Sequence, residues 1–143
     1  MSLKQLTVFV ENKPGALVGI TNTLAESNVN IRALSIADTE DFGILRLIVN
    51  DNENAKEKLT NAGYLIKTTE VVGVKIGDAP GKLSKALAVL DECGINLEYL
   101  YAFMSRTEKH AYVVIRVANN DAAETALQNA GFHIITDADV DKL

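Results

Sequence analysis

One short stretch of the chain is written twice, and this duplication limits the possible folds more than any other feature. Residues Asn12–Leu17 (NKPGAL) return as Asp78–Leu83 (DAPGKL), and the asparagine at Asn30 returns at Asn96 with the same offset. Each copy of the loop follows a short apolar run and precedes a segment with helical apolar spacing. Such a regular repeat indicates duplication of one structural unit. We therefore predict two units, residues 1–69 and residues 70–143.

Hydrophobic periodicity predicts the order of elements inside each unit. Alternation over residues 6–10 predicts a strand, and apolar residues spaced three and four apart over residues 17–24 predict a helix. The same criteria predict two strands joined as a hairpin, then a second helix and a fourth strand. Right-handed crossovers turn this order into an antiparallel sheet with both helices on one face. The predicted fold class is α+β, with two ferredoxin-like βαββαβ units.

The second unit is slightly longer than the first. Residues 61–64 (NAGY) return as residues 129–132 (NAGF), so the offset late in the units is larger by two than the offset of the Pro-Gly loops. We expect the two added residues in the hairpin turn at 105–109, because surface loops tolerate insertions.

Single residues are expected to begin or end these elements. Pro14 is placed in a first helical turn, which tolerates its missing N–H. Asn28 is a suitable left-handed end for that helix. Residues 39–43 are predicted to form the hairpin turn of the first unit. In the tail, Thr136 and Asp139 have the spacing of a capping box, which would start a short helix.

Strand alternation predicts which side chains face the helices. The expected core positions are Ile31, Ala33, Leu45, Leu47 and Val49, with Leu97, Tyr99, Val113, Ile115 and Val117 in the second unit. The opposite face would carry Leu34, Ile36, Ile44 and Ile48, with Leu100, Met104, Tyr112 and Val114 in the second unit. An apolar face of this extent normally meets a partner. We expect the sheets to be covered by each other or by a second copy of the chain, as in a homodimer.

The duplicated loop also supports a family resemblance. Glu11–Leu17 followed by Asn28–Ile31 resembles the ACT domain, a regulatory module that binds amino acids. The form at the end of bacterial phosphoglycerate dehydrogenase is the most similar, since a comparable Asn-x-Pro-Gly loop and Val-Asn-Ile strand start hold serine there. The resemblance implies ligands at the loops between first strand and first helix and at the interface between units. By position, it implies these ligand-binding residues: Asn12, Lys13, Pro14, Gly15, Ala16, Leu17, Asn30, Ile31, Asp78, Ala79, Pro80, Gly81, Lys82, Leu83, Asn96 and Leu97.

The resemblance also implies roles within this set. Asn12 and Asn30 would be the polar ligand contacts of the first unit, while the residues from Gly15 to Leu17 would supply backbone donors. Asp78 replaces the loop asparagine in the second unit. Its carboxylate would repel a ligand carboxylate and could hold an ammonium group, so equivalence of the two sites does not follow from the repeat.

Simpler explanations exist for the same residues. Asn12 and Asp78 could only cap helix starts. Asn30 and Asn96 could only bond to a neighbouring loop. Gly15 allows a tight turn whatever else it does.

Composition excludes several function classes. A net charge of −5 is unsuited to nucleic acid, which needs a basic surface. The single Cys93 cannot form an internal disulfide and suits a reducing compartment. No apolar run is long enough for a membrane span and the start lacks the core of a signal peptide, so we expect a cytoplasmic protein without membrane contact. His110 and His133 have no companions at metal-ligand spacing. We expect no metal, cofactor or catalytic residue.

The leading hypothesis is a stand-alone regulatory protein that binds a small free amino acid. The resemblance favours serine or another small polar residue, although histidine, aromatic and branched-chain ligands occur among related domains. The protein it regulates could be a metabolic enzyme or a transporter. Two alternatives remain open, namely an enzyme on a ferredoxin-like fold and a purely structural dimerisation module.

Overall fold

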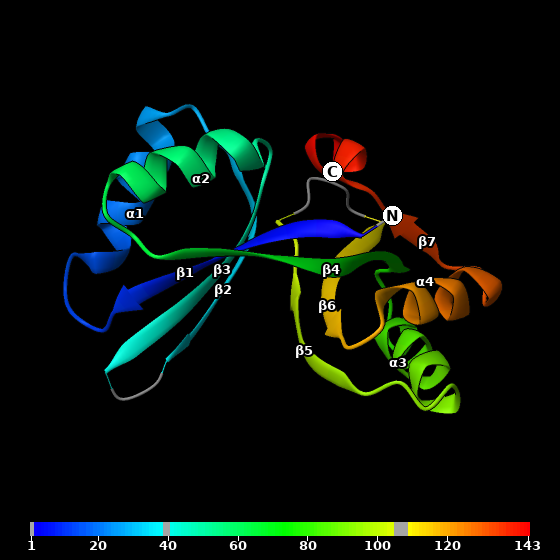
Figure 1. Ribbon diagram of the computed structural model, residues 1–143. Helices are drawn as coiled ribbons and strands as arrows, with labels where there is room; N and C mark the ends of the chain where they lie inside the picture. The colour runs from blue at the N-terminus through cyan, green and yellow to red at the C-terminus, as the bar shows by residue number, and fades with distance from the viewer. Residues whose placement is uncertain (1, 39–40, 105–108) are drawn as a thin grey trace. The chain divides into compact units, whose positions relative to one another are not determined.

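The computed structural model describes residues 2–38, 41–104 and 109–143, and the chain forms two compact units (Figure 1). The N-terminal unit is Lys4–Thr69, and the C-terminal unit is Glu70–Leu143 together with Ser2 and Leu3. Strand β4 (Ile66–Gly77) passes through this boundary. The fourth strand expected for the first unit and the first strand expected for the second are therefore one continuous element.

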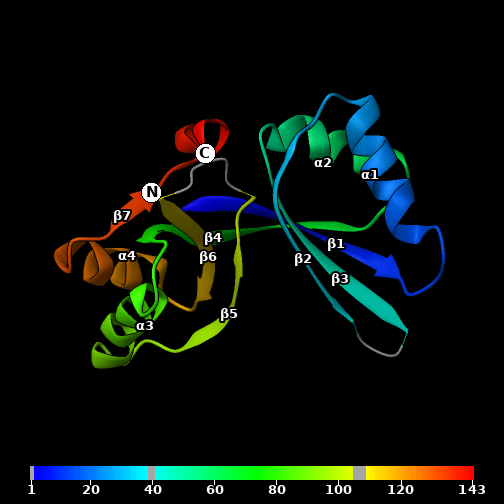
Figure 2. The ribbon, with the colours of Figure 1, turned by 180° about the vertical axis from the view of Figure 1, so that it is seen from behind.

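The N-terminal unit is a four-stranded sheet with two helices on one face. Its strands lie in the order β2-β3-β1-β4, and β3 is antiparallel to both of its neighbours. Helices α1 and α2 lie on the same face of the sheet in both views (Figures 1 and 2). The elements are β1 (Leu3–Glu11), α1 (Ala16–Glu26), β2 (Ile31–Asp38), β3 (Phe42–Val49), α2 (Asn52–Asn61) and the first part of β4.

The C-terminal unit repeats this plan in the order β5-β6-β4-β7. Its elements are the rest of β4, α3 (Lys82–Glu92), β5 (Leu97–Ala102), β6 (His110–Val117), α4 (Asn120–Asn129), β7 (His133–Ile135) and a final 3-10 helix η1 (Asp137–Lys142). Both units have the ferredoxin-like βαββαβ order, which confirms the predicted fold class. No helix among the described residues is long and apolar enough to cross a membrane.

Each unit has its own hydrophobic core between sheet and helices, and the two cores use equivalent positions. Ile20 and Leu24 of α1 are buried, as are their counterparts in the repeat, Ala86 and Leu90 of α3. The core of the first unit is Leu6, Val8, Val10, Ile20, Leu24, Val29, Leu45, Leu47, Val49, Ala55 and Leu59. That of the second is Val72, Val74, Ile76, Ala86, Leu90, Val113, Ile115, Val117, Ala123, Leu127 and Ile134.

Ile31 packs against the core as predicted, but the predicted faces are wrong for the rest of β2 because this strand contains a bulge. The register shifts between Ile31 and Ala33, so that Arg32 is the extra residue of the bulge. One extra residue moves every following side chain to the other face. Leu34 therefore pairs with the core residue Leu47, and Ile36 with Leu45 in the same way, whereas Ala33 pairs with Ile48 on the opposite face.

Strand β5 repeats the bulge at Glu98, which is the counterpart of Arg32 in the second unit. Tyr99 pairs with Arg116 and so lies away from the helices, contrary to its predicted core position. Leu100 pairs with the core residue Ile115, contrary to its predicted outward position. Where the register is regular, the alternation holds: Ile44, Ile48, Tyr112 and Val114 lie on the face opposite the core. A partner that covers that face stays a prediction.

The ends of the elements match the sequence analysis in part. Asn28 has the left-handed φ of 57° expected at a helix end. Thr136 and Asp139 form the predicted capping box at the start of η1. Pro14, however, precedes the helix, since α1 begins at Ala16. Phe42 and Gly43 belong to β3, not to the turn. Asp41 lies in a bend before β3. Positions 39–40 of that turn, and the insertion expected at 105–109 except for its last residue, lie outside the described residues.

Candidate functional site

The duplicated Pro-Gly loop forms the same tight turn in both units. The Ala16 N–H donates to the Lys13 carbonyl at 3.3 Å, and Gly15 has φ 86° and ψ −15°. This is the geometry of a type II turn, which needs a positive φ at its third residue and favours proline at its second. In the C-terminal unit the Lys82 N–H donates to the Ala79 carbonyl at 3.2 Å, and Gly81 has φ 88° and ψ −9°. Pro14 therefore sets a turn instead of a helical position.

The helices after these turns begin without a side-chain cap. The N-cap of α1 is Gly15 and that of α3 is Gly81, and neither receives a capping bond from a side chain. Helices α2 and α4 are capped by Asp51 and Asn119. The explanation that Asn12 and Asp78 serve as caps is therefore wrong. The first-turn N–H groups of α1 and α3 are left without intrahelical partners, at the positive end of the helix dipole.

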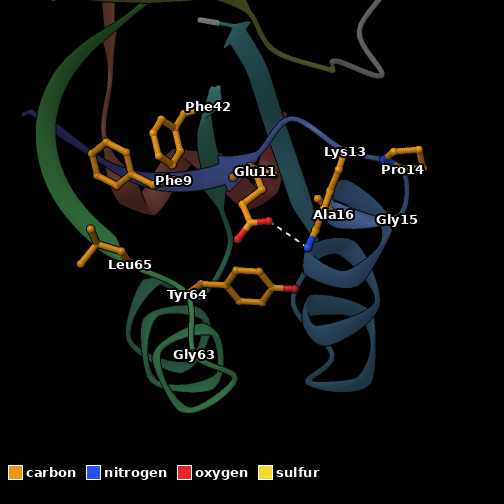
Figure 3. A pocket seen from close by; sticks show the side chains of 11 residues that line it. Phe9, Glu11, Lys13, Pro14, Gly15, Ala16, Phe42, Gly63, Tyr64 and Leu65 are labelled. Atoms are coloured by element: carbon orange, nitrogen blue, oxygen red, sulfur yellow. Dashed lines mark ion pairs between the residues drawn. The ribbon is translucent and has the colours of Figure 1, made fainter. Parts of the chain in front are cut away.

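A hollow of about 660 Å³ lies beside the first turn, and we call it the N-terminal hollow. Three segments meet there, namely the end of β1 with the loop that follows, the first residue of β3, and the chain between α2 and β4 (Figure 3). The Phe9 N–H donates to the Leu65 carbonyl at 3.1 Å, which holds the first and third segments together. The lining residues are Phe9, Val10, Glu11, Lys13, Pro14, Gly15, Ala16, Phe42, Gly63, Tyr64 and Leu65.

One end of this hollow is apolar. Phe9, Phe42 and Leu65 gather there, and their exposed fractions are 40%, 54% and 69% (Figure 3). Large apolar side chains scattered singly over a surface need no explanation, but three that line one concave site indicate a place where an apolar group binds.

The other end of the hollow carries an ion pair. The Lys13 Nζ lies 2.8 Å from Glu11 Oε2 (Figure 3). The hydrogen bond and the charge of Lys13 lower the pKa of Glu11, and those of Glu11 raise the pKa of Lys13. Both groups are consequently ionised at neutral pH. The hollow offers one negative and one positive charge beside an uncapped helix start.

Tyr64 closes the hollow against α1. A Cβ atom placed on Gly19 would lie only 2.7 Å from the Tyr64 hydroxyl oxygen. A larger residue at position 19 would therefore have to displace this hydroxyl.

The C-terminal unit has a hollow at the equivalent place, with a volume of about 440 Å³, which we call the C-terminal hollow. It is lined by Lys75, Ile76, Gly77, Lys82, Lys85, His110, Gly131, Phe132 and His133. In the repeat, Lys75 is the counterpart of Phe9, while His110 and His133 are the counterparts of Phe42 and Leu65. The three apolar wall positions of the first hollow are thus basic or titratable in the second.

The whole chain, residues 1–143, matches the family model of the ACT domain pair. The chain belongs to this family. The ACT resemblance inferred from the loop is thereby confirmed.

Solved structures agree with this assignment. Protein BT0572 from Bacteroides thetaiotaomicron is 38% identical in sequence, with a TM-score of 0.93 and coverage of 100% of this chain and 98% of that one. The regulatory subunit of aspartate kinase from Thermus thermophilus is 18% identical, with a TM-score of 0.66 and coverage of 90% and 91%. The α and β subunits of an aspartokinase are 22% identical, with a TM-score of 0.60 and coverage of 89% and 90%. The last two likenesses concern the fold alone. No curated protein matched the sequence.

The ACT units bring together only part of the ligand set implied by the resemblance. Lys13, Pro14, Gly15 and Ala16 line the N-terminal hollow, and Lys82 lines the C-terminal one. Other members of the set stand on the same loops and helix starts without lining the hollows, namely Asn12, Leu17, Asp78, Ala79, Pro80, Gly81 and Leu83.

Asn30 and Ile31 lie at the far end of the sheet from the loop. Glu11 pairs with Phe42 at one end of β3, and Ile31 pairs with Val49 at the other. These ends are seven residues apart along a strand, or about 23 Å. One small ligand therefore cannot touch both the loop and Asn30 of the same unit. The Asn30 backbone instead bonds to Asn50, donating to its Oδ1 at 2.9 Å and accepting from its N–H at 3.2 Å.

Asn96 and Leu97 likewise lie at the far end of their sheet, since Leu97 pairs with Val117 at the end of β6. Asn96 lines a separate pocket with Gly94, Ile95, Glu98, Ala118 and Asn119. Leu97 packs partly buried against the core.

Sequence reasoning missed most of the hollow-lining side chains. Phe9, Glu11, Phe42, Tyr64 and Leu65 come from three segments that no local motif connects. His110 and His133 were set aside because neither has companions at metal-ligand spacing. The repeat could have identified them, because its two offsets relate the lining residues of one hollow to their counterparts in the other. Among the described residues, no three His, Cys, Asp or Glu side chains are grouped to hold a metal ion.

Proposed function

We propose that this ACT domain pair is a regulatory protein that binds a free amino acid in its N-terminal hollow. The observation that supports this most is the Glu11–Lys13 ion pair beside the uncapped start of α1. A free amino acid carries one carboxylate and one ammonium group, so its site needs complementary charges and hydrogen-bond partners for both.

The ligand carboxylate is received by the first-turn N–H groups of α1 and by Lys13. Lys13 lines the hollow beside the uncapped start of α1, where helix N–H groups lack intrahelical partners and the helix dipole favours negative charge. The ligand ammonium pairs with Glu11. Each member of the protein ion pair therefore exchanges its partner for a ligand group of the same sign, which limits the desolvation cost of binding.

The ligand side chain points toward the apolar end of the hollow. Phe9, Phe42 and Leu65 remain substantially exposed without a ligand, and covering them removes apolar surface from water. A branched-chain or aromatic amino acid fits this wall better than serine, which the loop resemblance alone favoured. Such a side chain gains binding free energy by burying apolar surface against this wall, and the serine side chain does not.

Regulation is the role that fits such a module. The family match spans residues 1–143 as two ACT units. We propose that ligand binding changes the contacts of the protein with a second copy of the chain, in a homodimer, or with a metabolic enzyme or transporter that uses the same amino acid.

Isothermal titration calorimetry with the twenty common amino acids tests this proposal. We expect binding by one or a few apolar amino acids, and weakening by about tenfold to a hundredfold in Glu11→Gln and Lys13→Gln, because each leaves a ligand charge unpaired. Glu57→Gln and Lys56→Gln, at exposed positions of α2, are the matched controls and should bind as the parent does. Full affinity in Glu11→Gln, or no binding by any amino acid, would refute the proposal.

Asn30→Ala separates the two possible locations. A ligand in the N-terminal hollow is about 23 Å from Asn30 of its own unit, so this variant should keep the affinity of the parent. A loss in Asn30→Ala with none in Glu11→Gln would move the site to the far end of the sheet, as the resemblance implies.

A further inference from the structure

We infer that the C-terminal hollow is a second site, which binds a small organic polyanion carrying at least two negative charges as carboxylates or phosphate. The inference uses residues of the C-terminal unit only, and it holds whether or not the first hollow binds an amino acid.

The lining of the C-terminal hollow is positively charged. It contains Lys75, Lys82 and Lys85 together with His110 and His133 and, among the described residues, no Asp or Glu. In the part of the chain that the structure describes, none of the three lysines forms a salt bridge with a carboxylate. Like charges gathered in one concave site repel each other and concentrate the field there. An anion that binds between them relieves this repulsion.

Lys82 is held in the hollow by the backbone beneath it. A Cβ atom on Gly77 would lie 3.1 to 3.2 Å from Cγ, Cδ and Cε of Lys82. The aliphatic stem therefore lies against the main chain of Gly77. Since these stem carbons are positioned, the ammonium loses less conformational freedom on binding than that of an ordinary surface lysine.

Lys85 has space for its side chain because Phe132 replaces a tyrosine on the segment beside it. It occupies the position equivalent to Gly19, where an added Cβ atom would lie only 2.7 Å from the Tyr64 hydroxyl oxygen. Phe132 stands in place of Tyr64 and has no hydroxyl. The C-terminal unit therefore has both the lysine and the aromatic residue that tolerates it.

Among the described residues, the carboxylates of Asp78 and Asp139 lie close to the hollow without lining it. Asp78 is exposed on the preceding loop. The Oδ2 of Asp139 accepts hydrogen bonds from the Thr136 N–H at 2.9 Å and the Thr136 hydroxyl at 3.0 Å, which lower the pKa of this carboxyl, and nearby His133 lowers it further. Neither group neutralises the three lysines.

The surroundings favour a small polyanion over a zwitterion or a polymer. Gly77 stands in place of Glu11 and Ala79 in place of Lys13, so the hollow lacks the carboxylate that an amino-acid ammonium would need. A net charge of −5 for the chain opposes binding to extended anionic surfaces such as nucleic acid or membranes. A hollow of about 440 Å³ is of the size that holds a small molecule.

Calorimetric titration of the full chain with pyrophosphate, citrate, inorganic phosphate and acetate tests the inference. We expect binding by pyrophosphate or citrate, much weaker binding by acetate, and a loss of affinity as sodium chloride is raised. A preference for pyrophosphate would identify phosphate groups as the recognised chemistry, and a preference for citrate would identify carboxylates. No binding by any of these anions at millimolar concentration would overturn the inference.

Variants assign the binding to this hollow. Lys82→Ala and Lys75→Phe, the latter restoring the residue of the other unit, should each weaken binding by about tenfold or more. Lys56→Ala, on α2 of the N-terminal unit, changes the net charge equally and should bind as the parent does. An equal loss in Lys56→Ala would show a net-charge effect and overturn the inference. Lys75→Phe should leave amino-acid binding unchanged, so the two sites can fail independently.

Discussion

The two hollows share a backbone and differ in almost every lining side chain. Gly15 and Gly81 have φ angles of 86° and 88°, and Gly63 and Gly131 have 93° and 92°. In contrast, the first lining has an apolar wall and an ion pair, whereas the second has three lysines and two histidines. Backbone positions with positive φ tolerate few residues. Side chains that face an open hollow are under no such restriction, so after duplication the shape persists while the chemistry diverges.

Some of the differences between the hollows are coupled. Gly19 faces the hydroxyl of Tyr64, and their counterparts are Lys85 and Phe132. Exchanging only one member of the first pair would produce a clash or leave a gap. Some lining and neighbouring residues of each hollow therefore depend on one another and have to change together.

The largest expected effect tests whether the two cores are equivalent. Leu24→Ala and Leu90→Ala remove side chains that are 1% and 2% exposed at corresponding helix positions. Each should lower the free energy of unfolding by about 2–5 kcal/mol, because a buried cavity is left behind. Urea denaturation measures both. A small loss for only one of them would show that the two cores are not packed alike.

The next effect separates the shared backbone from the divergent lining. Gly15→Ala and Gly81→Ala should each cost about 1–2 kcal/mol of stability, because alanine disfavours a left-handed φ. The cost is conformational and not steric, since an added Cβ would meet nothing within 4 Å at either position. Gly15 lines the N-terminal hollow, whereas Gly81 lies in the other unit, so only Gly15→Ala should also weaken amino-acid binding.

Melting curves of Gly15→Ala and Gly81→Ala measure the loss of stability, and calorimetry of the same variants measures their affinity for the amino acid. Equal weakening of amino-acid affinity in both would indicate that loop distortion, not occupancy of the hollow, is responsible.

A third effect tests the coupling between Gly19 and Tyr64. Alanine normally stabilises a helix interior by up to about 1 kcal/mol relative to glycine. In the parent, the contact of 2.7 Å with the hydroxyl should offset this gain. In a Tyr64→Phe background, Gly19→Ala should be more favourable by about 1 kcal/mol. A double-mutant cycle measures the difference, and a change of the same size in both backgrounds would exclude the coupling.

The smallest effect concerns the tail, which has no counterpart in the N-terminal unit. Hydrogen bonds from the Thr136 backbone and then its hydroxyl lower the pKa of Asp139. A lowered carboxyl pKa means that its stabilisation is complete above the unfolded value near 3.8 and is lost as pH falls through the folded value. Asp139→Asn should therefore cost about 1 kcal/mol or less at pH 7. The difference should shrink below about pH 4.

Melting curves recorded from neutral to acidic pH measure this difference in stability, with Asp141→Asn at an exposed position as the control. A penalty in Asp139→Asn that persists unchanged in acid would rule out the carboxylate as its source.

The fold could be predicted from sequence because it follows from patterns that are local or repeated. The Pro-Gly loops, the helix stripes and the constant spacing of the repeat are visible without coordinates. The faces of β2 and β5 could not be predicted, because simple alternation does not show that bulges fall at Arg32 and Glu98. The sequence predicted only part of the lining of each hollow. Their turns lie in the motif, but Phe42, Leu65, His110 and His133 reach them only through the pairing of strands distant in sequence.

The bulges at Arg32 and Glu98 have a consequence for how the protein behaves at high concentration. Strands β2 and β5 each end the strand order of their unit, so each has backbone groups that a foreign strand could pair with. A long, regular edge is a template for aggregation. The extra residue breaks the regular spacing of N–H and C=O groups and bends the strand. In the C-terminal unit, the exposed Glu98 also places a charge at the irregularity. Both units thus carry, at the same position, a feature that hinders the edge-to-edge polymerisation to which small sheets are prone.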